Sequence, residues 1–347
     1  MQALVINNKI SNVCSGGDGV ADSEKVCESV AAALNLEKGS KSVLPSSTGV
    51  IGWRLPAKEL AEDIVPRAVE GLQDESALNA AMAIMTTDRY PKLRSCNLRN
   101  GARIVGIAKG AGMIEPNMAT MLGYILTDAI IDKATLQDML ADIVPMSFNS
   151  ISVDGDESTS DTVAIVSSNK VELESEGEFK DALAGICRGL AADIVRNGEG
   201  TGHVMRVRIE NFPGSDEEAI RLGRHVVNSP LFKCAIAGND PNTGRLAGAV
   251  GSFMGKFKPE ESLDKVTMTL GGRTIFASNK FVLEGDAVEE ELSEHIKSAQ
   301  FDETESFPSH QKFVEIEVDF GEGSGSAEVL GSDLTDEYVA VNADYRS

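Results

Sequence analysis

The chain carries the stretch KGAGMIEPNMATML at residues 109–122. Its first part, Lys109 to Gly112, joins one cation to small residues, and glycine lets a backbone turn tightly or approach another group closely. Pro116 fixes its own φ and biases the residue before it away from helix. Thr120 stands next to the apolar run that follows. The stretch therefore predicts an unusual loop that delivers one hydroxyl to the start of a strand.

The hydroxyl of Thr120 has no His, Asp or Cys close to it in the sequence that could activate it. A threonine can become nucleophilic when the bond before it is cleaved, because its own α-amine then acts as the base. That amine has an ordinary pKa of about 7.7–8.0, and a general base works best when its pKa is close to the working pH. The alternative is that Thr120 is an ordinary strand residue after a loop of glycine and proline.

The whole stretch resembles the self-cleavage segment of the ornithine acetyltransferase family, which reads K-G-S-G-M-I-x-P-N-M-A-T-M-L. The match is long and nearly gapless, so it favours the catalytic interpretation of Thr120 over the structural one. The resemblance implies that the bond between Ala119 and Thr120 is cut autocatalytically. The products would be an α-chain of residues 1–119 and a β-chain of residues 120–347.

The resemblance also implies the architecture. We expect an α+β fold, built as a four-layer αββα sandwich of the self-cleaving ornithine acetyltransferase and aminopeptidase type, with a smaller C-terminal α/β domain. The main sandwich is expected at residues 1–212 and the C-terminal domain, with an active-site tail, at residues 213–347. A chain of 347 residues is long enough for two such domains.

A second loop punctuated by glycine reads SSTGVIG at residues 46–52. Its backbone amides could face an anion, although the same residues could form a plain turn between a strand and a helix. The family keeps the pattern S-T-G-V-I-G, and the resemblance implies that Thr48 and Gly49 form the oxyanion hole. Acyl transfer needs donors aimed at the developing oxyanion, and losing one typically raises the barrier by about 2.7–4 kcal/mol.

Substrate contacts are implied for several other residues. Lys109 follows an apolar strand and could neutralise a substrate carboxylate, although it could also be a solvated surface lysine. Glu199 lies in a glycine-bracketed loop at a helix C-terminus, where the helix dipole disfavours negative charge. A carboxylate is the expected partner of an ornithine ammonium group. The family pattern further implies substrate contacts for Thr86, for Thr120 itself and, in the C-terminal tail, for Asn342 and Ser347.

Some segments depart from the family pattern. Residues 7–16 read NNKISNVCSG where the family has N-S-G-N-A-N-A-x-x-G, and residues 197–202 read NGEGTG where it has D-G-E-G-A-T. Thr243 replaces a tryptophan, which should loosen local packing or open a pocket. The resemblance also implies that a further stretch precedes residue 1. These departures leave open the alternative that the chain is a truncated, non-catalytic paralogue.

The composition bounds the class of partner. The net charge of −22 argues against nucleic acid and anionic membranes, since both bind clusters of Lys and Arg. No apolar run approaches the ~18 residues of a membrane span, and the features of a signal peptide are missing. We expect a cytoplasmic protein, or a mitochondrial or plastid one in a eukaryote.

No metal or cofactor is expected. The five cysteines form no C-x-x-C pair, and an odd, unpatterned set suits a reducing compartment. The four histidines are far apart in the sequence and lack the spacing of a zinc motif. Residues 154–162 have a spacing of acidic residues that superficially suggests calcium, but the register of an EF-hand is absent. We interpret this segment as a hydrogen-bonded turn.

Hydrophobic periodicity and capping patterns predict the following elements. Strands are expected at residues 1–6, 42–44, 103–108, 122–127, 162–168, 204–209, 266–270, 274–276, 313–319, 326–330 and 338–342. Helices are expected at residues 24–36 (capped by Asp22-Ser23), 57–69, 75–85, 133–148, 178–197, 215–227, 246–253 and 287–299. Residues 93–102 are expected to be a connector.

The implied reaction is a two-step transfer of an acetyl group. Thr120 takes the acetyl group from N2-acetyl-L-ornithine, ornithine leaves, and L-glutamate then accepts the acetyl group, which recycles it in arginine biosynthesis. Some members of the family also use acetyl-CoA. The family assembles as a heterotetramer of two α and two β chains. An aminopeptidase-like relative of the same architecture stays open as a further alternative.

Overall fold

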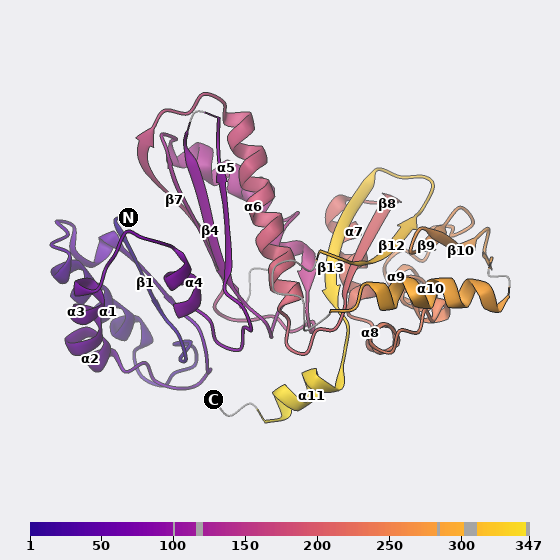
Figure 1. Cartoon of the computed structure of the whole chain (residues 1–347), viewed down its shortest axis with the longest axis horizontal. Helices are drawn as coiled ribbons and strands as arrows, with labels where there is room; N and C mark the ends of the chain where they lie inside the picture. The colour runs from indigo at the N-terminus through magenta and orange to yellow at the C-terminus, as the bar shows by residue number, and fades with distance from the viewer. Residues whose placement is uncertain (100, 116–120, 283–284, 302–310, 345–347) are drawn as a thin grey trace.

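The computed structural model describes residues 1–99, 101–115, 121–282, 285–301 and 311–344. Helices alternate with single strands and with groups of strands, and the strands pair both parallel and antiparallel, as the predicted α+β class requires. Figure 1 shows the chain passing from an N-terminal part through a central sheet to a C-terminal sheet. The described residues contain no helix that is long and apolar enough to cross a membrane.

The N-terminal part is a small layer of two parallel strands packed against helices. Its elements are β1 (Ala3–Asn7), α1 (Gly19–Ala33), a 3₁₀ turn (Gly39–Ser42), β2 (Val43–Ser47), α2 (Ala57–Glu59), a π-helical turn (Leu60–Ile64) and α3 (Val65–Glu70). The predicted cap of α1 was wrong, because Asp18 accepts the Ala21 N–H (3.0 Å) and starts the helix earlier. Asp22 instead pairs with Arg54.

The central part is a four-stranded sheet in the order β3-β4-β5-β7, in which only the β5–β7 pair is parallel. Its elements are α4 (Leu78–Ala83), β3 (Lys92–Asn97), β4 (Arg103–Lys109), β5 (Leu122–Ala129), α5 (Lys133–Ile143), a 3₁₀ turn (Phe148–Ser150), β7 (Thr162–Val171) and α6 (Glu176–Arg196). Helix α6 approaches β4 closely, because a Cβ at Gly106 would lie 2.7 Å from Ile186 and 2.8 Å from Leu190.

Two expectations for the central part were wrong. Residues 93–102 are not only a connector, because β3 pairs with β4 along the edge of the sheet. The strand is mostly polar and only one side of it is hydrogen-bonded, so its sequence lacks the apolar signal of a buried strand. Helix α5 ends at Ile143 and not at residue 148, because Pro145 has no N–H to donate to a helix carbonyl and so cannot continue the hydrogen-bond pattern of the helix.

The C-terminal part is a seven-stranded sheet in the order β11-β10-β9-β12-β8-β13-β6. Its elements are β6 (Ile151–Ser152), β8 (Val204–Phe212), α7 (Asp216–Val227), α8 (Pro230–Ala237), α9 (Thr243–Phe257), β9 (Thr267–Leu270), β10 (Arg273–Ala277), β11 (Lys280–Phe281), α10 (Asp286–Ser298), β12 (Val314–Asp319) and β13 (Gly325–Ser332). Strand β8 pairs with β12 and β13, so this sheet combines strands from before and after residue 212. The predicted domain boundary between residues 212 and 213 stays a prediction.

The predicted strand at residues 338–342 was also wrong. This segment is the helix α11 (Asp336–Ala343), the yellow helix at the lower end of the C-terminal part in Figure 1. Thr335 caps it by accepting the Tyr338 N–H (3.3 Å), and two acidic residues occupy its first turn. The alternation of Val339 and Val341 resembles a strand, but the segment pairs with no strand in the described part of the chain, and both valines are exposed.

Leu190 on α6 tests the packing of the helix on the central sheet. Its side chain is fully buried, whereas Leu126 on β5 is 40% exposed. We expect Leu190→Ala to lower the free energy of unfolding by about 2–5 kcal/mol, because it removes apolar contact and leaves a cavity. Leu126→Ala, the control with the same change of side chain, should cost clearly less. Urea unfolding of both variants measures the difference, and equal losses would contradict this account.

Candidate active site

A cavity of about 300 Å³ opens where the N-terminal part, the central sheet and the tail meet. It is lined by Ser11, Thr48, Gly49, Val50, Ile51, Thr86, Thr87, Lys109, Gly112, Met113, Ser158, Thr159, Ser160, Glu199 and Asn342. Six residues singled out by the sequence therefore meet in one place: Thr48, Gly49, Thr86, Lys109, Glu199 and Asn342. The other three, Ala119, Thr120 and Ser347, lie outside the described residues.

Lys109 and Thr48 form one side of the cavity. The Lys109 Nζ donates a hydrogen bond to the Thr48 Oγ1 (3.2 Å), and both side chains are buried. Burial lowers the pKa of Lys109, and the carboxylates of Asp88, Asp161 and Glu199 oppose that shift. Because the Thr48 oxygen accepts from a cation, its own hydroxyl proton is free to point into the cavity.

Gly49 continues this side of the cavity with a backbone donor. Its φ of +127° lies in the region that favours glycine, and a Cβ there would stand 2.1 Å from the backbone carbon of Lys9. The neighbouring amides are occupied, since Thr48 N donates to Asn7 O (3.0 Å) and Val50 N to Lys9 O (2.8 Å). The Gly49 N–H has no acceptor within the described ranges, so it remains available to a negatively charged oxygen.

A buried cluster of charged groups, formed by Asp88 and Lys92, lies next to Lys109. The Asp88 carboxylate accepts hydrogen bonds from Lys92 Nζ (2.5 Å), from the Gly110 N–H (2.8 Å) and from the Thr86 N–H (3.0 Å). Burial by itself would raise the pKa of Asp88, but the cations of Lys92 and Lys109 outweigh it and lower this pKa to about 2. Asp88 therefore stays ionised and fixes the backbone at Thr86 and at Gly110.

Glu199 brings a negative charge to the lining of the cavity. Its N–H donates to the Ala111 carbonyl (2.9 Å), and its Oε2 accepts from Asn342 Nδ2 (2.8 Å). A Cβ at Gly112 would lie 2.4 Å from a carboxylate oxygen of Glu199, so a side chain at this position would displace the carboxylate. Gly112 is thus what lets Glu199 approach residues 109–122, which we call the nucleophile loop after its expected role.

The C-terminal tail reaches the cavity through α11. Thr335 donates to the Gly200 carbonyl (2.6 Å), and Tyr338 donates its hydroxyl to Asp154 (3.2 Å). These contacts hold the helix that carries Asn342 against the Glu199 loop. The prediction that the tail folds back to this region agrees with the position of Asn342.

Two aspartates that the sequence did not single out hold the flanks of residues 116–120. They belong to the segment 153–161, which we call the aspartate loop. Asp154 accepts the N–H groups of Met113 (2.7 Å) and Ile114 (2.9 Å), on the upstream side. Asp161 accepts the N–H of Met121, on the downstream side. The sequence predicted a hydrogen-bonded turn here, but only the three-dimensional contacts reveal these two hydrogen-bond anchors.

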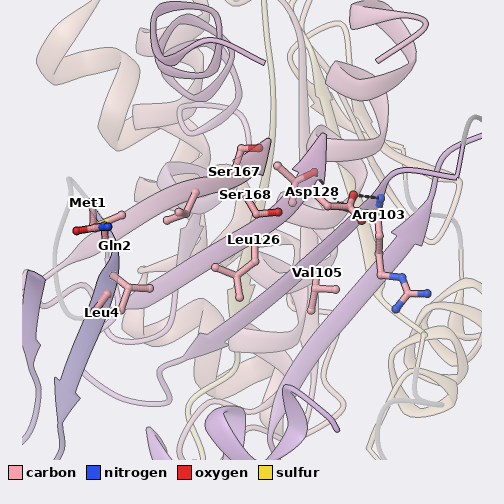
Figure 2. A pocket seen from close by; sticks show the side chains of 12 residues that line it. Met1, Gln2, Leu4, Arg103, Val105, Leu126, Asp128, Ser167 and Ser168 are labelled. Carbon is pink, nitrogen blue, oxygen red and sulfur yellow. Dashed lines mark hydrogen bonds between the residues drawn. The ribbon is translucent and has the colours of Figure 1, made fainter. Parts of the chain in front are cut away.

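Other cavities lack this combination of groups. A cavity of about 660 Å³ lies between β1 and the central sheet, and Figure 2 shows Leu4, Val105 and Leu126 around it. Another, of about 600 Å³, is lined by Thr243 and its neighbours, where the sequence had predicted that losing an aromatic side chain would loosen packing or open a pocket. No group of three or more His, Cys, Asp or Glu that could hold a metal is found in the described part of the chain.

Comparisons with known proteins agree with the sequence pattern. The model of the ArgJ family matches residues 1–347. The arginine biosynthesis bifunctional protein ArgJ of Deinococcus radiodurans is 37% identical over 99% of this chain and 82% of its own length. The glutamate N-acetyltransferase of Methanothermobacter thermautotrophicus is also 37% identical, over 99% of this chain and 83% of its own length.

A solved structure gives the same result for the fold. The arginine biosynthesis bifunctional protein ArgJ of Bacillus halodurans superposes with a TM-score of 0.55 and 31% sequence identity. The match covers 64% of this chain and 98% of that one. The mixed α+β fold predicted from the sequence is therefore confirmed.

The buried ion pair between Asp88 and Lys92 gives a prediction with a matched control. Asp88→Asn should lower the free energy of unfolding by about 3–5 kcal/mol at neutral pH, because it leaves a buried ammonium without its counter-charge. Asp63→Asn removes an i,i+4 partner of the same kind, but the Asp63–Arg67 pair is exposed, so its loss should cost less than about 1 kcal/mol. Urea unfolding measures both.

The pH dependence of the same variant follows from the depressed pKa of Asp88. A carboxyl with a folded pKa near 2 and an ordinary value of 3.8 contributes stability that is fully present above about pH 4. This contribution is lost as the pH falls towards 2. The difference in stability between the wild-type protein and Asp88→Asn should therefore shrink over this range, and a difference that stayed constant from pH 6 to pH 2 would contradict the assignment.

Proposed function

The chain belongs to the ArgJ family, and from this premise we propose that it is the glutamate N-acetyltransferase and ornithine acetyltransferase of arginine biosynthesis. It moves the acetyl group of N2-acetyl-L-ornithine to L-glutamate. The observation that carries this proposal is the meeting of Thr48, Gly49, Lys109 and Glu199 on one cavity next to residues 113–115 and 121. The donors of Thr48 and Gly49 suit the acetyl oxygen of the substrate. The Lys109 cation suits its carboxylate, and the Glu199 anion suits its ammonium group.

The charges of the cavity suit the donor substrate. N2-Acetyl-L-ornithine carries one carboxylate and one ammonium group. The buried Lys109 ammonium pairs with the carboxylate, and Glu199 accepts hydrogen bonds from the ammonium, since charge-assisted hydrogen bonds are the strong ones. Asn342 already bonds to Glu199 and orients its carboxylate. The hydroxyl of Thr86 and the terminal Ser347 complete the set of substrate contacts in this proposal.

The chemistry is carried by Thr120. Cleavage of the bond between Ala119 and Thr120 releases the α-amine of Thr120, which accepts the proton of its own hydroxyl as the oxygen attacks the acetyl carbonyl. The developing oxyanion takes hydrogen bonds from the Thr48 hydroxyl and the Gly49 N–H. Supporting this role, the Thr48 oxygen already accepts from Lys109 and the Gly49 amide has no other acceptor among the described residues.

The second half of the reaction reverses the first with another amine. Ornithine leaves, and the amino group of L-glutamate attacks the acetyl ester on Thr120, which gives N-acetylglutamate and the free hydroxyl. Because the enzyme holds the acetyl group between the two substrates, the steady-state kinetics should be of the ping-pong type.

The finer architecture belongs to the same proposal. It includes a four-layer αββα sandwich over residues 1–212, a C-terminal α/β domain over residues 213–347, and a heterotetramer of two α and two β chains. The site of action is the cytoplasm, or the mitochondrion or plastid in a eukaryote.

Replacement of the nucleophile gives the most direct test of the mechanism. Thr120→Ala should abolish both the cleavage and the acetyl transfer, because no hydroxyl remains to attack either carbonyl. Thr120→Ser should still be processed, since its hydroxyl is retained. Intact-mass spectrometry distinguishes the full chain from the fragments 1–119 and 120–347, and an assay of acetyl exchange measures the transfer. Normal processing of Thr120→Ala would refute the assignment.

Glu199 tests the recognition of the ornithine ammonium group. Glu199→Gln should raise KM for N2-acetyl-L-ornithine by about 10- to 100-fold, which corresponds to the loss of a hydrogen bond between charged groups. Glu62→Gln, which changes an exposed glutamate paired with Lys25, serves as the control and should leave KM unchanged. An unchanged KM in Glu199→Gln would show that the ammonium group binds elsewhere.

A further inference from the structure

Self-cleavage needs a base that the mature enzyme does not need. Before the bond between Ala119 and Thr120 is cut, the nitrogen of Thr120 is an amide and cannot accept a proton. The α-amine that serves as base in the acetyl transfer therefore does not yet exist during maturation. Another group must therefore take the hydroxyl proton. This inference rests on the proposed function, since only that function requires the cleavage.

Asp161 is the described carboxylate that is joined most directly to the nucleophile. Its Oδ1 accepts the N–H of Met121, and that nitrogen is bonded to the carbonyl carbon of Thr120. Only the carbonyl carbon, Cα and Cβ of residue 120 separate the nitrogen from the hydroxyl oxygen. The Met121 carbonyl in turn accepts the Thr162 N–H (3.0 Å), so the aspartate loop holds this residue at both of its backbone groups.

The second oxygen of Asp161 takes no part in the hydrogen bond to Met121. The Asp161 Oδ2 is buried and has no hydrogen-bond partner among the described residues. A buried carboxylate oxygen without a partner is unusual, because desolvation without compensation costs free energy. The oxygen is therefore available to a proton that arrives during a reaction.

Three other carboxylates of this region already have hydrogen-bond partners. The oxygens of Asp88 bond to Lys92 and to two backbone amides, and those of Asp154 bond to two amides and to Tyr338. Glu199 accepts from Asn342. These carboxylates hold the structure of the site, whereas Asp161 combines a fixed position with an unused oxygen.

The electrostatic surroundings suit a group that exchanges a proton. Burial raises the pKa of Asp161 to about 7, and the Met121 N–H and the cation of Lys109 oppose the rise. Lys109 is the charged side chain that acts on Asp161, and it also faces Asp88 and Glu199. A carboxyl that titrates near neutral pH can both accept and return a proton under working conditions.

We propose that Asp161 accepts the hydroxyl proton of Thr120 during self-cleavage and passes it to the departing nitrogen. The Thr120 oxygen forms a bond to the carbonyl carbon of Ala119, and the bond from that carbon to the Thr120 nitrogen breaks. The proton moves from the oxygen to Asp161 and on to the nitrogen, which becomes the α-amine.

An ester between the Ala119 carbonyl and the Thr120 oxygen results. A water molecule then adds to the ester carbon, and the bond to the Thr120 oxygen breaks. The water supplies the hydrogen of the restored hydroxyl and the acid proton of the new Ala119 carboxyl group, and the latter proton is lost to solvent. In the mature enzyme Asp161 keeps only its hydrogen bond to Met121, because the new amine takes over as base.

The test uses Asp161→Asn in the full chain. Asparagine retains an oxygen that can accept the Met121 N–H, but it cannot accept a proton. Chains made by cell-free translation are followed by denaturing gel and intact mass at several pH values. We expect Asp161→Asn to be cleaved about 100-fold more slowly than the wild type, or slower still.

The pH profile distinguishes this role from a structural one. Cleavage of the wild type should accelerate as the pH rises through about 7, because the ionised carboxylate is the active form, whereas cleavage of Asp161→Asn should be flat there. Asp128→Asn serves as the control, since Asp128 also accepts a backbone N–H, from Arg103 (2.7 Å), at the far end of β5. It should be cleaved like the wild type.

Two results would overturn the proposal. One is cleavage of Asp161→Asn at the wild-type rate, and the other is a wild-type cleavage rate that shows no ionisation near neutral pH, which needs no variant at all. Failure of the transferase is a separate outcome. Cleavage that depends on Asp161 in a chain that moves no acetyl group would refute the proposed function while supporting the role of Asp161.

Discussion

The hydrogen bonds between the aspartate loop and the nucleophile loop are the constraint on which the site depends. Asp154 holds Met113 and Ile114, and Asp161 holds Met121, so one loop fixes both sides of the segment that contains the expected scissile bond. The aspartate loop lies between β6, which belongs to the seven-stranded sheet, and β7, which belongs to the central sheet. The residues on both sides of that segment are therefore held at the junction of the two sheets.

The same region concentrates charge in a buried place. Lys92 and Lys109 are almost fully buried, and Asp88 lies between the β4 loop and the segment before β3 with its oxygens bonded to both. Buried charges cost free energy to desolvate, and a buried ion pair is weak evidence for stability. The arrangement is better explained by the position that it imposes on Lys109. This cation is the last residue of β4, is held close to Thr48 and interacts with the carboxylate of Glu199, which follows α6.

The tail shows how a distant segment can belong to such a site. Helix α11 has few buried side chains and gains little from packing. It is held by particular hydrogen bonds, from Thr335 to Gly200 and from Tyr338 to Asp154, which connect it to the Glu199 loop and to the aspartate loop. Because the aspartate loop also holds Met113, Ile114 and Met121, the tail and the flanks of residues 116–120 share one set of anchors.

The sequence by itself determined the family, the mixed fold and the residues Thr48, Gly49, Thr86, Lys109, Glu199 and Asn342 that the structure brings to one cavity. It did so because residues 46–52 and 109–122 are contiguous motifs whose glycines meet local needs: a positive φ at Gly49 and room for the Glu199 carboxylate at Gly112. Only the tertiary structure decided that residues 336–343 are helical, that β3 exists, and that Asp88, Asp154 and Asp161 hold the site. Edge strands, tail helices and single aspartates take their roles from partners far away in the chain, and no local pattern of apolar residues records such partners.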